Sequence, residues 1–310
     1  MVTTVRAPNP SPMTLDGTNS YVLDCGAGAA LVIDPGPPIP LHLEALRASA
    51  AADDLAIRFI VLTHGHGDHA GGAKLLAAAT DAQIFAHPKC SVAHDADLPL
   101  ESDLVLGELA LRVVDAPGHT FDHAIFYHER ERALFTGDTI LGQGTTVIAP
   151  PDGAMRPYQR TLQRLADEFG AARTIYGGHG SVVTDPSAKI AEYIAHRRMR
   201  EEQIVAALAA GEGTIPDLVR TIYSPQPNPL WPAMARQILA HLLALQSEGR
   251  VVARPAGRAL SAAESAMLNP DLATIVGPEE AALMGDEIGA QLRLDSLDEY
   301  RLAEGSTLPS

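Results

Sequence analysis

Short apolar runs, separated by polar turns and amphipathic stretches, fill the first 195 residues of the chain. The runs predict strands at Tyr21 to Leu23, Ala30 to Ile33, Ile57 to Leu62, Gln83 to Ala86, Leu109 to Val114, Ala124 to Tyr127, Ala133 to Thr136 and Thr174 to Tyr176. Helical spacing predicts helices at Leu41 to Ala50, Ala70 to Ala79, Pro157 to Phe169 and from Ser187 onward. Short strands followed by strand–helix alternation are typical of two sheets packed face to face with helices outside. We therefore predict an α/β fold, an αββα sandwich, for residues 1–195.

From residue 196 the pattern becomes mostly helical. The helix that begins at Ser187 is expected to run to Ala210, and a short helix follows at residues 215–219. A third helix is predicted from Pro229 to Glu248, where apolar residues recur at helical spacing. Residues 250–254 have the pattern of a short strand. Three helices and a strand predict a small winged-helix-like domain over residues 196–255.

The last segment, residues 256–310, is acidic and follows neither pattern. Apolar residues recur at helical spacing only in patches such as Ile288, Leu292 and Leu294. The segment stays unassigned, and two expectations remain for it. It is either disordered, or it docks on the partner subunit of a homodimer.

The composition is that of an ordinary globular protein of a reducing compartment. Hydrophobic residues make up 46% of the 310 positions and charged residues 20%. The two cysteines, Cys25 and Cys90, give no disulfide framework. The N-terminus lacks the basic and apolar stretches of a signal peptide, and no apolar run reaches the roughly 18 residues of a membrane span. We expect a cytoplasmic protein with no membrane partner.

Charge is distributed unevenly along the chain. Apart from Arg258, the net charge of −15 divides into −10 over residues 1–195, +2 over residues 196–255 and −8 over the last fifty residues. Non-specific nucleic-acid binding depends on clustered Lys and Arg that neutralise phosphates. The chain has three lysines and no dense basic run. The charge pattern therefore disfavours RNA as a substrate and favours a small molecule.

Four side chains that can bind a metal follow the strand predicted at Ile57 to Leu62. Imidazole and carboxylate groups suit zinc and its neighbours, and Gly65 and Gly67 allow a sharp turn that brings the four together. A solvated, His-rich turn that binds nothing is the alternative. The four residues are His64, His66, Asp68 and His69.

Three further candidates stand at the ends of later strands. Each follows an apolar run and a glycine, so four strand ends would meet at one sheet edge and support a site on rigid elements. Together with the first four they are enough for two divalent ions, for which zinc is expected and iron or manganese are the alternatives. The three are His119, Asp138 and His179.

This ordered set of residues resembles the metallo-β-lactamase fold superfamily, and the resemblance implies a ligand set in three parts. One metal would be held by His64, His66 and His119. The second would be held by Asp68, His69 and His179, and Asp138 would bridge the two. Asp34, in Val-Ile-Asp-Pro-Gly, would be a buried residue behind the ligands, with an ordinary Asp-Pro-Gly turn as the alternative.

A narrower resemblance covers most of the chain. Residues 9–21, Pro117 to His123 and Pro229 to Val251 are similar to the lactamase-β-like protein 2 group. Members of this group join a metallo-hydrolase domain to a small helical domain. The animal member cleaves single-stranded RNA, and related two-domain proteins include thioesterases. Because the third helix carries Arg236 as its one basic residue, we expect the helical domain to wall the active site and not to bind DNA.

Two chemistries remain open for such an enzyme. A hydroxide that bridges two metal ions would attack a small ester, thioester or lactone, or, as the alternative, the phosphodiester of single-stranded RNA. Asp68 and Asp138 would favour two dications and orient the hydroxide. His123, four residues after His119, would contact a ligand or the substrate, with a structural role as the alternative. A non-catalytic metal-binding or partner-binding protein is the third hypothesis.

Overall fold

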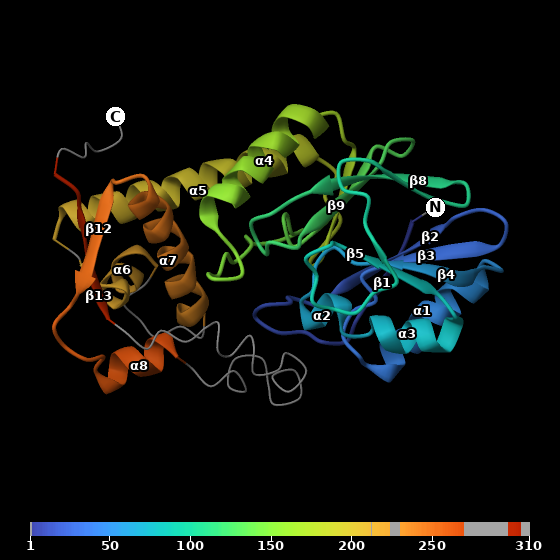
Figure 1. The fold of residues 1–310 in the computed structure, drawn as a ribbon, viewed down its shortest axis with the longest axis horizontal. Helices are drawn as coiled ribbons and strands as arrows, with labels where there is room; N and C mark the ends of the chain where they lie inside the picture. The colour runs from blue at the N-terminus through green and yellow to red at the C-terminus, as the bar shows by residue number, and fades with distance from the viewer. Residues whose placement is uncertain (1, 212, 224–229, 270–296, 305–310) are drawn as a thin grey trace.

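Two mixed β-sheets face each other in the first part of the molecule (Figure 1). The computed structural model describes residues 2–211, 213–223, 230–269 and 297–304. The first sheet has the order β1-β2-β3-β4-β5-β6; its strands are Val2–Arg6, Asn19–Asp24, Ala29–Ile33, Ala56–Val61, Gln83–Ala86 and Ala96–Asp97. The second has the order β11-β10-β9-β8-β7; in chain order β7 to β11 are Asp103–Leu106, Leu109–Asp115, Ala124–His128, Ala133–Gly137 and Thr174–Gly177.

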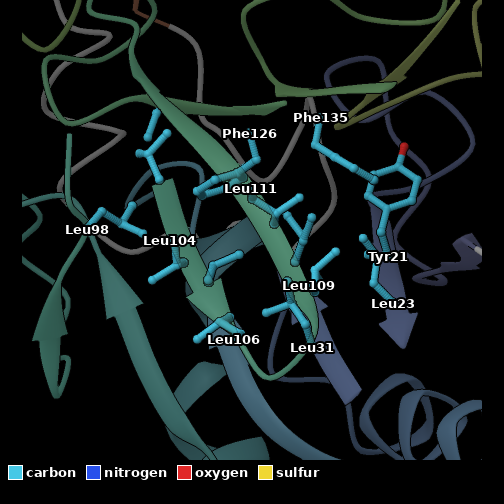
Figure 2. Close-up of a cluster of buried hydrophobic side chains, with 14 of the residues drawn as sticks. Tyr21, Leu23, Leu31, Leu98, Leu104, Leu106, Leu109, Leu111, Phe126 and Phe135 are labelled. Carbon is cyan, nitrogen blue, oxygen red and sulfur yellow. The ribbon is translucent and has the colours of Figure 1, made fainter. Parts of the chain in front are cut away.

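The alternation of side chains along each strand divides the core into layers. On β2, Tyr21 and Leu23 point between the sheets, whereas Val22 points to the opposite face. Figure 2 shows Tyr21 and Leu31 of the first sheet meeting leucine and phenylalanine side chains of the second. The ring of Tyr21 lies edge-on to that of Phe135, with 5.4 Å between centroids. Side chains from the inner faces of both sheets therefore form the core that holds the sheets together.

Helices cover the two outer faces of the sandwich. The helices α1 (Pro40–Ala52), α2 (Gly67–Ala70) and α3 (Ala73–Thr80) lie on the first sheet. The helices α4 (Met155–Phe169) and α5 (Pro186–Ala209) lie on the second. This layering confirms the predicted αββα sandwich. No helix among the described residues has the length and apolar character needed to cross a membrane.

The second part of α5 belongs to a separate helical domain, on the left in Figure 1. The other elements there are α6 (Ile215–Ile222), α7 (Trp231–Ser247), β12 (Val251–Pro255), α8 (Ala262–Leu268) and β13 (Asp298–Leu302). They enclose a core of their own around Leu218, Leu242 and Leu245. The second part of α5 with α6, α7 and β12 confirms the winged-helix-like fold expected here, and α8 and β13 add to it.

The structure adds elements that the apolar pattern did not predict. Strands β1 and β7 were not expected; β1 has polar residues at three of its five positions, and β7 is a four-residue strand that begins with Asp103. The helix expected over Ala70 to Ala79 is divided into α2 and α3, and α4 begins two residues before Pro157. The predicted helix start at Pro229 lies outside the described residues.

Part of the unassigned acidic segment is ordered. Strand β13 pairs antiparallel with β12, and Tyr300 is buried in the core of the helical domain. The helix α8 also lies in this segment, so the expectation of disorder is wrong for Ala262–Leu268 and for Asp298–Leu302. The apolar patch at Ile288, Leu292 and Leu294 lies outside the described residues.

Candidate metal centre

Four strand ends and the short helix α2 bring all seven predicted metal ligands to one place. The loop after β4 and the helix α2 carry four of them, and the segments that follow β8, β10 and β11 carry one each. Their ligand atoms form three overlapping groups, in each of which the atoms lie within 4.8 Å of one another. These groups are His64, His66 and His119; His64, His69 and Asp138; and Asp68, His69 and His179.

Hydrogen bonds on the outer side of the cluster fix the orientation of three of its imidazoles. The Nδ1 of His69 donates to the Asp34 carboxylate at 2.8 Å. The Nδ1 of His119 donates to the Val147 carbonyl at 2.9 Å, and the Nδ1 of His179 faces the Gly17 carbonyl at 3.3 Å. Each ring thereby directs its Nε2 at the interior of the cluster.

His64 and His66 are oriented by two residues that do not belong to the cluster. The Thr63 hydroxyl donates to Asp34 at 2.7 Å and so accepts from His64 Nδ1 at 3.0 Å. The Nε2 of His66 lies 3.1 Å from Asp152 Oδ2. The inner nitrogen of His66, Nδ1, then lies 3.0 Å from His64 Nε2 and 3.1 Å from His119 Nε2.

The two aspartates face the remaining histidines. Asp68 Oδ2 lies 3.3 Å from His179 Nε2 and 3.6 Å from His69 Nε2. Asp138 reaches both halves of the cluster, because its carboxylate lies 3.7 Å from His119 Nε2 and 3.3 Å from His69 Nε2. His69 Nε2 and Asp138 Oδ1 are buried without a hydrogen-bond partner. Buried nitrogen and oxygen atoms that lack hydrogen-bond partners and surround one small volume are suitable ligands for divalent metal ions.

The pKa pattern divides the cluster in the same way. Burial, followed by the neighbouring His66, lowers the pKa of His119 to about 4, and burial with the charge of His69 lowers the pKa of His64. Burial opposes a raised pKa at His179, but Asp138 and Asp68 outweigh it and raise the value to about 10. At His66 burial opposes the shift, but the hydrogen bond to Asp152 and the charge of Asp68 raise the pKa. Burial therefore favours the neutral form of two imidazoles in one half, and carboxylates lie beside the histidines of the other.

Two glycines are required because the site is tightly packed. A Cβ at Gly178 would lie 2.3 Å from Asp138 Oδ1 and 2.5 Å from His69 Cε1. A Cβ at Gly65 would lie 2.9 Å from Asp122 Oδ2. Gly65 is not among the glycines with a positive φ, so close packing, and not the sharp turn expected from the sequence, explains the glycine there.

His123 lies behind the cluster and does not line the cavity described below. Its ring is fully buried, stacks on His64 with 4.9 Å between centroids, and accepts from the Asp138 backbone N–H at 3.2 Å. Burial, followed by the charge of His119, lowers the pKa of His123 well below its ordinary value. The ring is therefore a neutral acceptor that positions Asp138. Of the roles expected for it, the contact with ligand residues is the one that these hydrogen bonds and ring contacts support.

Asp34 occupies the place that the resemblance implied. It lies at the end of β3 with a φ of 50° and accepts from His69, from the Thr63 hydroxyl and, at 2.7 Å, from the Thr63 backbone N–H. The sequence reasoning missed Thr63 and Asp152. Thr63 precedes His64 directly and could have been noticed; Asp152 comes from the loop before α4 and has no sequence signal that ties it to His66.

A cavity of about 350 Å³ opens from the metal centre towards the helical domain. His119 and Asp138 of the metal centre line it, together with residues of α5 and α7. Apolar side chains make up much of the wall, among them Met13, Leu15 and Met234. The helical domain therefore walls one side of the site, as expected.

Comparison with known proteins agrees with this geometry. Residues 13–179 match the family model described as the metallo-beta-lactamase superfamily, and residues 214–258 match that of the beta-lactamase associated winged helix domain. A beta-lactamase-like protein 2 homolog of Drosophila melanogaster is 34% identical over 78% of this chain and 87% of its own length. An atrochrysone carboxyl ACP thioesterase of Aspergillus chevalieri is 32% identical over 73% of this chain and 74% of its own. A metallo-beta-lactamase family protein of Thermus thermophilus has a TM-score of 0.68 at 25% identity, over 82% of this chain and 95% of that one.

Proposed function

The chain belongs to the metallo-β-lactamase superfamily and is a hydrolase, and from that premise we propose a binuclear zinc enzyme that cleaves a small ester, thioester or lactone. The observation that carries the proposal is the inward set of donor atoms. Five imidazoles turn one nitrogen outward to a fixed partner and the other inward, where two carboxylates join them.

The donor set suggests how the two ions would be held. One would be held by His64, His66 and His119 and the other by Asp68, His69 and His179. Asp138, which faces members of both groups, would bridge them. When bound, the ions would bring the pKa of a coordinated water to about 7 and polarise the scissile carbonyl. Zinc is preferred because imidazole nitrogen and carboxylate oxygen are its usual ligands, and iron or manganese are the alternatives.

The chain's own residues supply orientation. Asp34 accepts from His69 and, through Thr63, sets the tautomer of His64, so a single carboxylate orients one ligand of each proposed ion. Asp152 does the same for His66. Partners of this kind hold a metal ligand in one rotamer and one tautomer. The site would therefore be organised before the substrate arrives.

Size and charge support a small acyl substrate. The cavity of about 350 Å³ is at the low end of the range for drug-sized ligands. The sandwich domain has a net charge of −10 over residues 1–195, which repels a polyanion such as RNA. A relative that covers most of this chain has thioesterase in its name. A thioester is accordingly the first substrate to test.

The deciding experiment is an assay of zinc-loaded protein against matched thioesters, esters and lactones, and against single-stranded RNA at about 0.15 M salt. We expect turnover of at least one acyl substrate and none of RNA. Asp68→Asn should abolish this turnover, whereas Asp24→Asn, the same change on an exposed residue of the first sheet, should not. RNA cleavage that depends on Asp68, without acyl turnover, would replace this proposal with the ribonuclease alternative.

A further inference from the structure

Two arginines of α5 line the cavity beside the metal centre. Arg197 and Arg200 lie one turn apart, and both contribute to the wall of the cavity on the side of α5. Arg197 is 1% exposed and is among the largest fully buried side chains of the described chain. A buried guanidinium remains charged, so its environment must supply compensation.

Neither arginine has a carboxylate partner among the residues that the structure describes. Other arginines of this region do: Arg156 and Arg250 both pair with Glu201, the latter at 2.8 Å. Arg197 instead donates through Nη2 to the Thr146 carbonyl at 2.7 Å. Such a neutral acceptor satisfies one N–H and leaves the positive charge uncompensated.

Aromatic rings hold the two guanidinium groups in place. Arg197 lies 5.2 Å from the centroid of Tyr158, and Arg200 lies 4.3 Å from that of Tyr223. Cation–π contacts of this kind fix orientation without adding negative charge. The Nε atoms of both arginines have no hydrogen-bond partner in the described chain. The same holds for Nε2 of Gln237, another residue of the cavity wall.

The described part of the wall offers the two arginines no anion outside the metal centre. Of its described side chains the one carboxylate is Asp138, which lies at the metal centre. His196 also lines the wall and lies close to both arginines. Burial, followed by the charges of Arg197 and Arg200, lowers the pKa of His196 to about 4. A cavity with hydrogen-bond donors and uncompensated cations in its wall is complementary to a ligand with an anionic acceptor.

We propose that Arg197 and Arg200 form an anion subsite, and that the substrate is an apolar acyl compound with a carboxylate or phosphate group remote from the scissile bond. This inference rests on the proposed hydrolase function and narrows its substrate class. The scissile bond lies at His119 and Asp138, the body of the substrate lies along Met13, Leu15 and Met234, and the anionic group lies against α5. RNA does not fit, because a cavity of about 350 Å³ has room for one small ligand.

The test compares thioesters of one neutral thiol whose acyl chains have equal length and end in a carboxylate, a phosphonate or a carboxamide. For zinc-loaded wild-type protein we expect kcat/KM for the better of the two anions to exceed that for the amide at least about tenfold, the scale of a single charge-assisted hydrogen bond. Which anion gives the larger ratio identifies the chemistry of the group. Equal kcat/KM values for all three substrates would overturn the proposal.

Two substitutions distinguish a local contact between the arginine and the anionic group from a general effect of the protein's charge. Arg200→Gln should reduce the ratio to within about twofold of unity, since the hydrogen-bonding fork is lost. Arg198→Gln is the matched control, because Arg198 is exposed on the same helix and lies outside the cavity wall. It removes the same charge and should keep the ratio. An equal loss in both variants would show long-range attraction only and would refute a subsite. Circular dichroism confirms that each variant is folded.

A binding measurement distinguishes failure of this inference from failure of the hydrolase proposal. Thioether analogues of the same three compounds are titrated against zinc-loaded protein, and the fluorescence of Trp231, the chain's one tryptophan and the first residue of α7, reports binding. Tighter binding of an anionic analogue that depends on Arg200 and not on Arg198 supports the subsite even if no thioester is hydrolysed. Equal binding of charged and neutral analogues would overturn it, whether or not the protein is an esterase. If the carboxylate of an analogue instead bound the metal ions directly, the affinity of that analogue would not change in Arg200→Gln.

Discussion

Asp34→Asn is the substitution that tests most sharply how the site is organised. Asp34 accepts three hydrogen bonds, one from His69 Nδ1 and two from Thr63. If the amide oxygen of asparagine keeps the bond from the Thr63 backbone, its NH₂ group faces His69 Nδ1. The ring must then accept at Nδ1 and carry its proton on Nε2, the atom directed at the cluster. A protonated Nε2 cannot bind a metal.

The size of the effect follows from the number of rings involved. Loss of an outer partner of a metal ligand lowers metal affinity by about 10- to 100-fold, or about 1.4–2.8 kcal/mol. Here the Thr63 hydroxyl also loses its acceptor, and with it the fixed tautomer of His64. Because His69 and His64 belong to different halves of the cluster, we expect both zinc affinities to fall, each by about this amount.

Competition with a chromophoric zinc chelator measures the two dissociation constants directly. Asp24→Asn is the control, because Asp24 is an exposed residue of the same sheet whose carboxylate accepts from the Gly26 N–H at 2.7 Å. It should leave both constants unchanged. Asp34→Asn protein with native circular dichroism and zinc affinities within about threefold of the wild type, well under the usual effect, would refute the tautomer argument.

Three further predictions follow from the same structure. Wild-type protein should bind close to two zinc ions per chain by elemental analysis, and fewer than one after zinc titration contradicts the binuclear site. His66→Ala should lower kcat at least about tenfold with unchanged far-UV circular dichroism, whereas His94→Ala, remote from the cluster, should not. Glu201→Gln should lower the free energy of unfolding by about 2–3 kcal/mol at pH 7; burial opposes the shift, but the neighbouring His241 and the hydrogen bonds from Arg156 and Arg250 lower the pKa of Glu201. The contribution of Glu201 to stability is therefore present above the ordinary carboxyl pKa and is lost as the pH falls below that value. Chemical denaturation should show that the difference in unfolding free energy between wild type and Glu201→Gln shrinks below about pH 4. A difference that does not change with pH would contradict this role of Glu201.

The parts that could be predicted from the sequence depend on short-range signals. A glycine and a metal-competent side chain directly after an apolar run mark a strand end, and this rule located His119, Asp138 and His179, which the structure brings together with the earlier four. Apolar periodicity located the strands that are buried on both faces. It missed β7, a short strand in which exposed Val105 lies between buried leucines and which therefore has one buried face.

The parts that could not be predicted depend on contacts between distant segments. Asp152 meets His66 across 86 positions, and no local pattern distinguishes it from any other aspartate in a Pro-Asp-Gly loop. Strand β13 pairs with β12 although its sequence is charged at three of five positions. Backbone hydrogen bonds to the neighbouring strand and the burial of Tyr300 stabilise it, and neither is visible in its own residues.

The helix α5 is anchored in both domains, and this restricts the length of the substrate. Its first turns pack on the sandwich, where the Tyr193 hydroxyl accepts from the Leu141 N–H at 2.9 Å. Its last turns, with Ile204 and Leu208, form part of the core of the helical domain. Arg197 and Arg200 lie between these anchors, on an uninterrupted helix of 24 residues. Because a helix anchored at both ends cannot slide or bend freely, the distance from Asp138 to the two guanidinium groups is set by the fold. The enzyme should therefore select substrates by the length between the scissile carbonyl and the anionic group, and not by charge alone.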